Sequence, residues 1–206
     1  MLEAHDLACL RGDRLLFRRL GFSLAAGELL RVAGPNGSGK TSLLRILSGL
    51  ASAETGSLHW RGQDTRRERE AWHAELIYLG HAPALSELLT PLENLRFAAA
   101  AEGIEASTAA CRDALQRIGL ERQLGLPCRV LSQGQRRRVA LARLLLPRSR
   151  AVWILDEPFA ALDVTAVSAL SERIAAHAAA GGMAIFTTHQ EAGLAARTLD
   201  LQDFAA

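Results

Sequence analysis

The chain of 206 residues has 49% hydrophobic and 22% charged side chains, a composition that indicates a folded globular protein and excludes a disordered one. Its formal net charge of +2 is too small to indicate a nucleic-acid partner. The N-terminus carries acidic residues where a signal peptide needs an apolar run, no stretch approaches ~18 uninterrupted apolar residues, and the three cysteines form no metal-binding pattern. We therefore expect a protein of a reducing compartment that reaches a membrane only through a partner.

The first 80 residues alternate short apolar segments with turns. A tight turn at residues 11–14 separates the first two segments, and a glycine-rich turn after residue 33 leads into a helical pattern that Gly49 ends. The predicted strands span residues 2–10, 15–24, 28–33, 57–63 and 75–80.

The middle of the chain has helical periodicity instead. We expect a mostly helical lobe over about residues 82–150, with a helix at 134–146 near its end. A strand at 151–155, a helix over roughly 164–180 and a strand at 183–188 then follow, and both strands are apolar throughout.

Apolar strands that alternate with helices are typical of an α/β protein with a mainly parallel sheet covered on both faces. We expect a single domain over residues 1–206 with an antiparallel β region at its N-terminus. Residues 1–81 and 151–206 would form the α/β core, and the helical lobe would be inserted between these two halves.

The strongest local signal is a glycine-rich loop that satisfies G-x-x-x-x-G-K-[ST]. Glycines allow backbone N–H groups to surround phosphate oxygens, and the following helix directs its positive end at the same anion. The lysine would contact the β- and γ-phosphates, and the threonine hydroxyl would coordinate Mg²⁺. The residues expected to bind ATP here are Gly34, Pro35, Asn36, Gly37, Ser38, Gly39, Lys40, Thr41 and Ser42.

Lys40 strengthens this interpretation because it is the only lysine in the chain, beside 23 arginines. Position 40 evidently requires a compact ammonium group. A phosphate loop alone does not distinguish a kinase, a GTPase and a transporter ATPase. The guanine-specificity motif N-K-x-D needs a second lysine, so the GTPases are excluded.

Asp156 and Glu157 are adjacent carboxylates at the end of the apolar strand 151–155. Such a pair is costly to place there unless it serves a cation or a polar reaction. The alternative is a solvated acidic pair at a strand end, which is less favoured beside the phosphate loop.

Leu131-Ser132-Gln133-Gly134-Gln135 resembles the LSGGQ signature of the ABC ATPase family, with Gln133 in place of the middle glycine. Ser132 and Gly134 would begin a helix whose N-terminal amides attract anions. The resemblance covers nearly the whole chain and implies a P-loop NTPase fold of the ABC cassette type. It also implies a dimer in which residues 132–135 of one copy bind the γ-phosphate held by the other: Ser132, Gln133, Gly134 and Gln135.

The same resemblance implies roles for the remaining polar motifs. Asp156 would hold Mg²⁺ and Glu157 would be the general base. His189, after the apolar strand 183–188, resembles the switch histidine, and residues 161–163 resemble the D-loop at the dimer interface. We assign no chemistry to Arg136, Arg137 and Arg138, which we expect to form a solvated face of the signature helix.

Two positions depart from the family pattern. The aromatic residue that usually stacks on adenine is replaced by Arg11, so that either an arginine plane or Phe17 would pack there. The Q-loop glutamine, which the family uses in catalysis and coupling, is replaced by His81. Histidine still forms hydrogen bonds but titrates near neutral pH, and we expect hydrolysis to survive the change.

A short cassette, the Q-loop histidine and the segments LTPLENL, DEPFAALD and FTTHQ together resemble the ATPases of bacterial cytochrome c maturation. This resemblance implies a permease of two membrane subunits, a role in haem export and a peripheral location on the cytoplasmic face of the inner membrane. The alternatives are an exporter ATPase for another cargo, a soluble ABC protein of DNA repair or translation, a small-molecule kinase and a non-catalytic cassette.

Overall fold

A computed structural model of the chain describes residues 1–147 and 150–205. It contains two sheets. The first is antiparallel, with the order β2-β1-β4-β5. Its strands are β1 (Leu2–Arg11), β2 (Arg14–Leu24), β4 (Thr55–Trp60) and β5 (Gln63–Asp64).

The second sheet is parallel throughout, with the order β6-β7-β8-β3-β9. Because all its strands run the same way, their carboxyl ends meet at one edge. The phosphate loop follows β3, the two carboxylates follow β7, and His189 lies just beyond β8. The strands are β3 (Leu29–Ala33), β6 (Leu76–Leu79), β7 (Val152–Leu155), β8 (Met183–Thr187) and β9 (Arg197–Asp200).

Strand β7 shows why its sequence is continuously apolar. Val152 and Ile154 point into a core shared with the antiparallel sheet and helix α1 (Lys40–Leu47). Trp153 and Leu155 point to the opposite face, where they pack with helix α6 (Val164–Ala179) and the end of helix α5 (Gln133–Leu141). Both faces of the sheet are thus covered, so only the strand ends offer room for polar chemistry.

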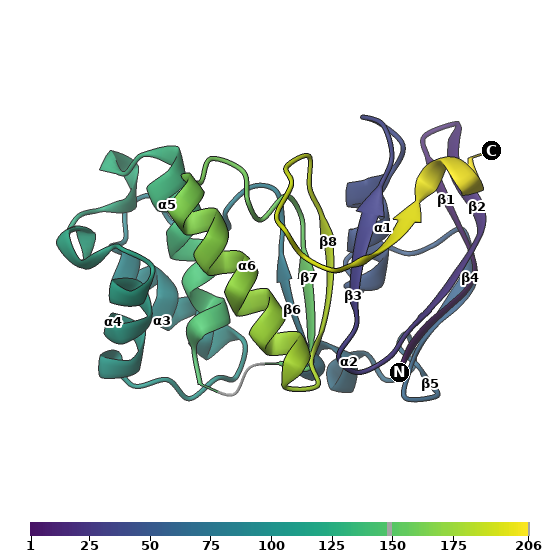
Figure 1. Cartoon of the computed structure of the whole chain (residues 1–206). Coiled ribbons are helices and arrows are strands. Elements are labelled where there is room, and N and C mark those ends of the chain that lie inside the picture. The colour runs from purple at the N-terminus through teal and green to yellow at the C-terminus, as the bar shows by residue number, and fades with distance from the viewer. Residues whose placement is uncertain (148–149, 206) are drawn as a thin grey trace.

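The lobe between the two halves of the core has its own apolar centre. Figure 1 shows its helices and the antiparallel sheet on opposite sides of the parallel sheet. Its helices are α3 (Pro91–Ala101), α4 (Thr108–Arg117) and α5 (Gln133–Leu141). Residues 148–149 of the predicted lobe, and residue 206 of the predicted domain, lie outside the described residues. No helix in the described ranges combines the length and apolar character needed to cross a membrane.

The mainly parallel sheet, the antiparallel region and the helical lobe confirm the predicted fold class. Some elements differ from the prediction. The helix expected at 134–146 ends as an α-helix at Leu141 and continues as a 3₁₀ helix over Ala142–Leu145. Helix α2 (Arg69–Glu75) and the edge strand β9 were not predicted, because each buries only one residue fully.

Asn94 fixes the segment that enters the lobe. This buried side chain accepts a hydrogen bond from the Ser86 N–H at 2.8 Å, and its amide nitrogen lies 2.9 Å from the Ser86 carbonyl oxygen. The same nitrogen is 3.2 Å from the Leu89 carbonyl oxygen and 3.1 Å from that of Thr90. One amide therefore holds the loop between β6 and α3 in place.

We expect Asn94→Ala to lower the free energy of unfolding by about 1–3 kcal/mol, because it removes the hydrogen-bond partner of the Ser86 N–H and carbonyl groups at a partly buried position. Urea denaturation would measure the loss. Gln116→Ala, which removes an exposed amide from α4, is the matched control and should change stability by less than about 0.5 kcal/mol. Equal stability of the Asn94 variant and the wild type would contradict this role.

Candidate nucleotide site

The loop between β3 and α1 has the backbone shape of an anion cradle. Gly34, Gly37 and Gly39 adopt φ angles of 134°, 80° and 104°, which side chains with a Cβ rarely adopt. A Cβ on Gly39 would also lie 3.2 Å from the side chains of Leu16 and Phe17. Helix α1 begins at Lys40 without a side-chain cap, so its first amides suit an anion.

The ammonium group of Lys40 lies over this same loop. It donates hydrogen bonds to the Gly34 carbonyl at 2.8 Å and the Pro35 carbonyl at 3.1 Å. These contacts place the compact ammonium group of Lys40 at the cradle.

Asp156, which follows β7, connects the helix after β3 with the last residue of β8. The Thr41 hydroxyl donates to its Oδ2 at 2.8 Å, and the Thr187 hydroxyl donates to its Oδ1 at 2.7 Å. The Asp156 residue is only 2% exposed. A carboxylate and a hydroxyl at hydrogen-bonding distance are hard oxygen donors of the kind that Mg²⁺ prefers, so Thr41 and Asp156 fit the predicted metal.

Thr187 was not among the predicted site residues. It is fully buried, and its hydroxyl also accepts a hydrogen bond from the Glu157 N–H at 2.8 Å. The hydroxyl therefore connects Asp156 with the backbone of Glu157. A threonine at the end of the apolar strand β8 was the available signal, since polar groups at that sheet edge face the site.

Glu157 and His189 lie next to each other, a contact that the sequence analysis did not predict. The His189 N–H donates to one Glu157 carboxylate oxygen at 3.3 Å, and its Nε2 lies 3.5 Å from the other. Glu157 adopts a φ angle of 49°, in the left-handed region that only a minority of non-glycine residues occupy. Backbone strain of this kind is concentrated at functional sites.

The signature segment forms a capped helix start. The Ser132 hydroxyl accepts a hydrogen bond from the Gln135 N–H at 3.2 Å, and the Gln135 side chain accepts one from the Ser132 N–H at 2.9 Å. A Cβ on Gly134 would lie 2.5 Å from the Ala161 carbonyl oxygen, so this position requires glycine. The segment packs against the predicted D-loop of the same chain.

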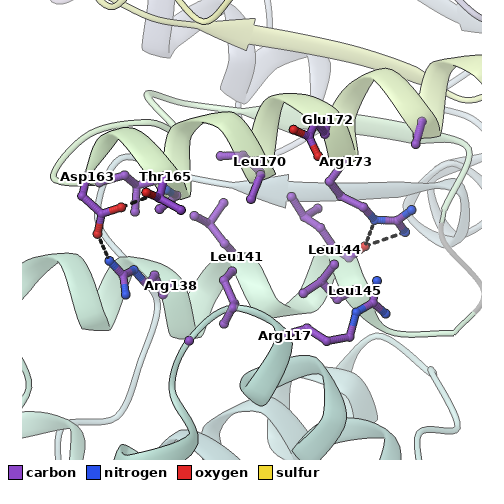
Figure 2. A pocket seen from close by; sticks show the side chains of 16 residues that line it. Arg117, Arg138, Leu141, Leu144, Leu145, Asp163, Thr165, Leu170, Glu172 and Arg173 are labelled. Carbon is purple, nitrogen blue, oxygen red and sulfur yellow. Dashed lines mark hydrogen bonds and ion pairs between the residues drawn. The ribbon is translucent and has the colours of Figure 1, made fainter.

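The D-loop ends where α6 begins, and an ion pair ties this point to α5. Asp163 caps α6 through the Ala166 N–H, and its other carboxylate oxygen pairs with Arg138. Figure 2 shows this pair at one end of a cavity of about 690 Å³ between α5 and α6. The described residues that line the cavity include none of the predicted nucleotide-binding residues.

The expectation that Arg136, Arg137 and Arg138 form a solvated face is wrong for Arg137. Only 3% of this residue is exposed, and its guanidinium donates to the carbonyl groups that follow β6 and β7. Helix α5 lies between the lobe and the core, which places its middle arginine against the sheet edge. Burial lowers the pKa of the Arg137 guanidinium, while the charges of Asp156 and Glu157 act to raise it.

Arg11 and His81 are the residues at the two positions that depart from the family pattern. His81 and Arg11 are both exposed, and the His81 carbonyl lies 3.3 Å from the Arg137 guanidinium. Phe17 is completely buried in the core beneath Gly39. The suggestion that Phe17 stacks on adenine is therefore wrong, because neither face of its ring is available.

Comparison with known proteins agrees with this geometry. The sequence model of the family described as ABC transporter matches residues 17–160. The chain belongs to the ABC transporter family. It is 61% identical over 208 aligned positions to the cytochrome c biogenesis ATP-binding export protein CcmA of Aromatoleum aromaticum, covering 100% of this chain and 97% of that protein. As a member of this family, the chain is an ABC ATPase.

Solved structures confirm the fold of the cassette. A putative ABC transporter ATP-binding protein from Pyrococcus furiosus superposes with a TM-score of 0.85 at 23% identity, covering 100% of this chain and 99% of that one. A dimeric ATP-binding cassette in a post-hydrolysis state with ADP and Pi superposes with a TM-score of 0.80 at 21% identity, covering 92% and 88%.

We expect Thr187→Val to lower kcat for ATP hydrolysis about 10- to 100-fold, because the catalytic carboxylates lose their shared hydroxyl. ATP affinity should change little, since Thr187 contacts no residue of the phosphate loop in the described structure. Phosphate release and binding of a fluorescent nucleotide would measure the two effects. Thr187→Ser keeps the hydroxyl and should retain activity. Equal rates for the valine and serine variants would contradict the role.

Proposed function

We propose that the chain is the ATP-hydrolysing subunit of a haem export complex in cytochrome c maturation. Two copies would work as a head-to-tail dimer on the cytoplasmic face of the bacterial inner membrane. The observation that carries this proposal is the 61% identity with a cytochrome c biogenesis export protein across the whole chain. The site geometry supports hydrolysis, because the predicted catalytic groups converge at one sheet edge.

ATP would lie on residues 34–42, with its phosphates against the loop amides, the start of α1 and the Lys40 ammonium. Thr41 and Asp156 would hold Mg²⁺ together with phosphate oxygens and water. When bound, this ion neutralises charge on the β- and γ-phosphates. The exposed Arg11 is the side chain that remains available to pack on adenine.

The second copy would complete the site with its signature segment. Ser132, Gln133, Gly134 and Gln135 form the first turn of α5, whose N-terminus carries positive potential. Among the described residues, the side chains of Ser132 and Gln135 bond to each other's backbone and not to the phosphate loop. They are thus available to a nucleotide held by another copy.

Hydrolysis would begin with a water molecule next to the carboxylate of Glu157. As the water oxygen attacks the γ-phosphorus, the bond to the β–γ bridging oxygen breaks and Glu157 accepts the proton. His189, which bonds to this carboxylate, would position it and contact the γ-phosphate. Positioning and charge neutralisation contribute most of the barrier reduction in such reactions.

The permease would contact the surface around residues 81–95. This surface includes the exposed residues His81 and Leu88, of which Leu88 is 76% exposed. Asn94 holds the loop firmly, so motion of the lobe would move the loop with it. We expect two membrane subunits as partners and no nucleic acid. The export protein that aligns over 97% of its length supports transport rather than DNA repair or translation.

A mixed dimer tests the composite site. Lys40→Ala removes the phosphate contact and Ser132→Arg blocks the signature segment, so each variant alone should be inactive. A complex that contains one copy of each, isolated with two different affinity tags and the membrane subunits, has one competent site. Its rate of phosphate release should be clearly measurable and at most about half that of the wild type.

The control pairs Ser132→Arg with a chain that carries both changes, which leaves no competent site. This complex should be inactive although it contains the same substitutions. If the wild type hydrolyses ATP and the mixed dimer is no more active than the control, the head-to-tail arrangement is wrong. Failure of the wild type to bind ATP would overturn the proposed function as a whole.

His81→Ala should uncouple hydrolysis from transport, because the residue belongs to the surface proposed to meet the permease and its carbonyl is bonded to Arg137 beside the catalytic edge. In the complete complex, turnover stimulated by the membrane subunits should fall at least about tenfold, while nucleotide binding is retained. His81→Gln, which introduces the usual family residue, should preserve coupling. Unchanged stimulated turnover in the alanine variant would show that His81 has no Q-loop role.

A further inference from the structure

Arg137 joins three parts of the cassette through one buried guanidinium group. Its Nη1 donates to the carbonyl of Gly80 at 2.8 Å and lies 3.3 Å from that of His81. Its Nη2 donates to the carbonyls of Asp156 at 2.6 Å and Glu157 at 2.7 Å. The fork thus links helix α5 to the segments after β6 and after β7.

A buried cation is costly, so this arrangement needs compensation. The hydrogen bonds to four carbonyl oxygens offset part of the cost of burying the guanidinium, and the negative charges of Asp156 and Glu157 offset a further part. A planar guanidinium bonds two backbone segments at once, which the point charge of a lysine cannot reproduce. The position therefore selects arginine for its shape as well as its charge.

The backbone of Glu157 is held from both sides. Its N–H donates to the Thr187 hydroxyl, and its carbonyl accepts from Arg137. This residue has the strained φ angle of 49°, which persists only where surrounding contacts impose it. Arg137 bonds to both peptide groups that flank the catalytic carboxylate, whereas Thr187 and the Ala160 N–H each bond to one of them.

The element that Arg137 connects to the Glu157 backbone is its own helix, the signature helix α5. Ser132 caps α5, and Arg137 is the fifth residue of that helix. We propose that Arg137 is a positioning residue that couples the orientation of the signature helix to the placement of Glu157 in the same chain. This inference rests on the proposed function, because the signature helix would contact the nucleotide held by the second copy.

The consequence is communication between the two sites of the dimer. Closure of the signature segment on the partner's nucleotide moves α5, and Arg137 conveys that movement to the Glu157 and His81 segments. The placement of each chain's catalytic carboxylate then depends on the position of its own signature helix, which Arg137 links to the Glu157 backbone. Arg137 itself contacts neither the phosphate loop nor the reacting atoms in the described structure.

The first experiment measures kcat and KM for ATP in Arg137→Ala within the complete complex. We expect kcat to fall about 100-fold, because a displaced base costs that much, while KM changes less than about threefold. Added guanidinium or methylguanidinium at millimolar concentration should restore part of kcat by occupying the vacated space. Arg136→Gln, which removes a partly exposed arginine paired with Glu87, is the control and should keep wild-type kinetics.

Three results would overturn the proposal: wild-type kcat in Arg137→Ala, a loss of affinity without loss of kcat, or an equal loss in the Arg136 control. If the alanine variant does not fold, Arg137→Lys decides, since it keeps the charge and loses the fork. We expect its kcat to fall at least about tenfold. A lysine variant with the wild-type rate would overturn the role.

The mixed dimer of a Lys40→Ala chain and a Ser132→Arg chain then shows in which of the two chains Arg137 acts. Its one competent site takes Glu157 from the Ser132→Arg chain and the signature segment from the Lys40→Ala chain. Adding Arg137→Ala to the chain with the working Glu157 should abolish the activity, whereas adding it to the other chain should reduce activity less. The reverse order would assign Arg137 to the signature helix alone and overturn the proposal. Inactivity of the mixed dimer without any Arg137 change would instead refute the composite site.

Discussion

The hydrogen-bonded carboxylate of Asp156 is the constraint on which the catalytic edge of the sheet depends. A carboxylate that is 2% exposed is tolerated only if its oxygens have partners, and here Thr41 and Thr187 each donate to one of them. These two hydroxyls come from the helix after β3 and the end of β8, so one side chain after β7 gathers three neighbouring segments. Every carboxylate oxygen still has acceptor capacity for a cation.

The polar side chains at this edge can be held in place because the strands that lead to them are almost entirely apolar. Every residue of β7 and β8 but Thr187 is a buried hydrophobic one, so the strands stay fixed while their ends carry charge. Arg137 adds a buried positive group beside the two carboxylates and bonds only to backbone carbonyls at the described positions. A rigid core and a balanced charge cluster together hold polar groups in geometries that isolated segments would not keep.

The sequence was sufficient where local pattern decides structure. The apolar strands and the glycine-rich cradle follow from periodicity and glycine geometry, and the location of Glu157 and His189 at strand ends follows from the shared edge of a parallel sheet. Arg137 could not be found in this way, because three consecutive arginines on a helix give no sign of which one faces the core. Thr187 was missed for a related reason: a threonine suits a strand equally well whether its hydroxyl is structural or functional.

Intrachain contacts also prepare the signature segment for its proposed partner. Ser132 and Gln135 satisfy each other's backbone, and Gly134 lies directly against the Ala161 carbonyl of the D-loop. The helix start is therefore ordered before any second copy approaches, and ordering it adds no entropic cost to association. Closure of the dimer would change the position of the whole helix. Arg138 connects this helix to Asp163, and Arg137 connects it to the catalytic edge of the sheet. A rigid helix with attachments at both places transmits displacement, which a flexible loop in the same position would absorb.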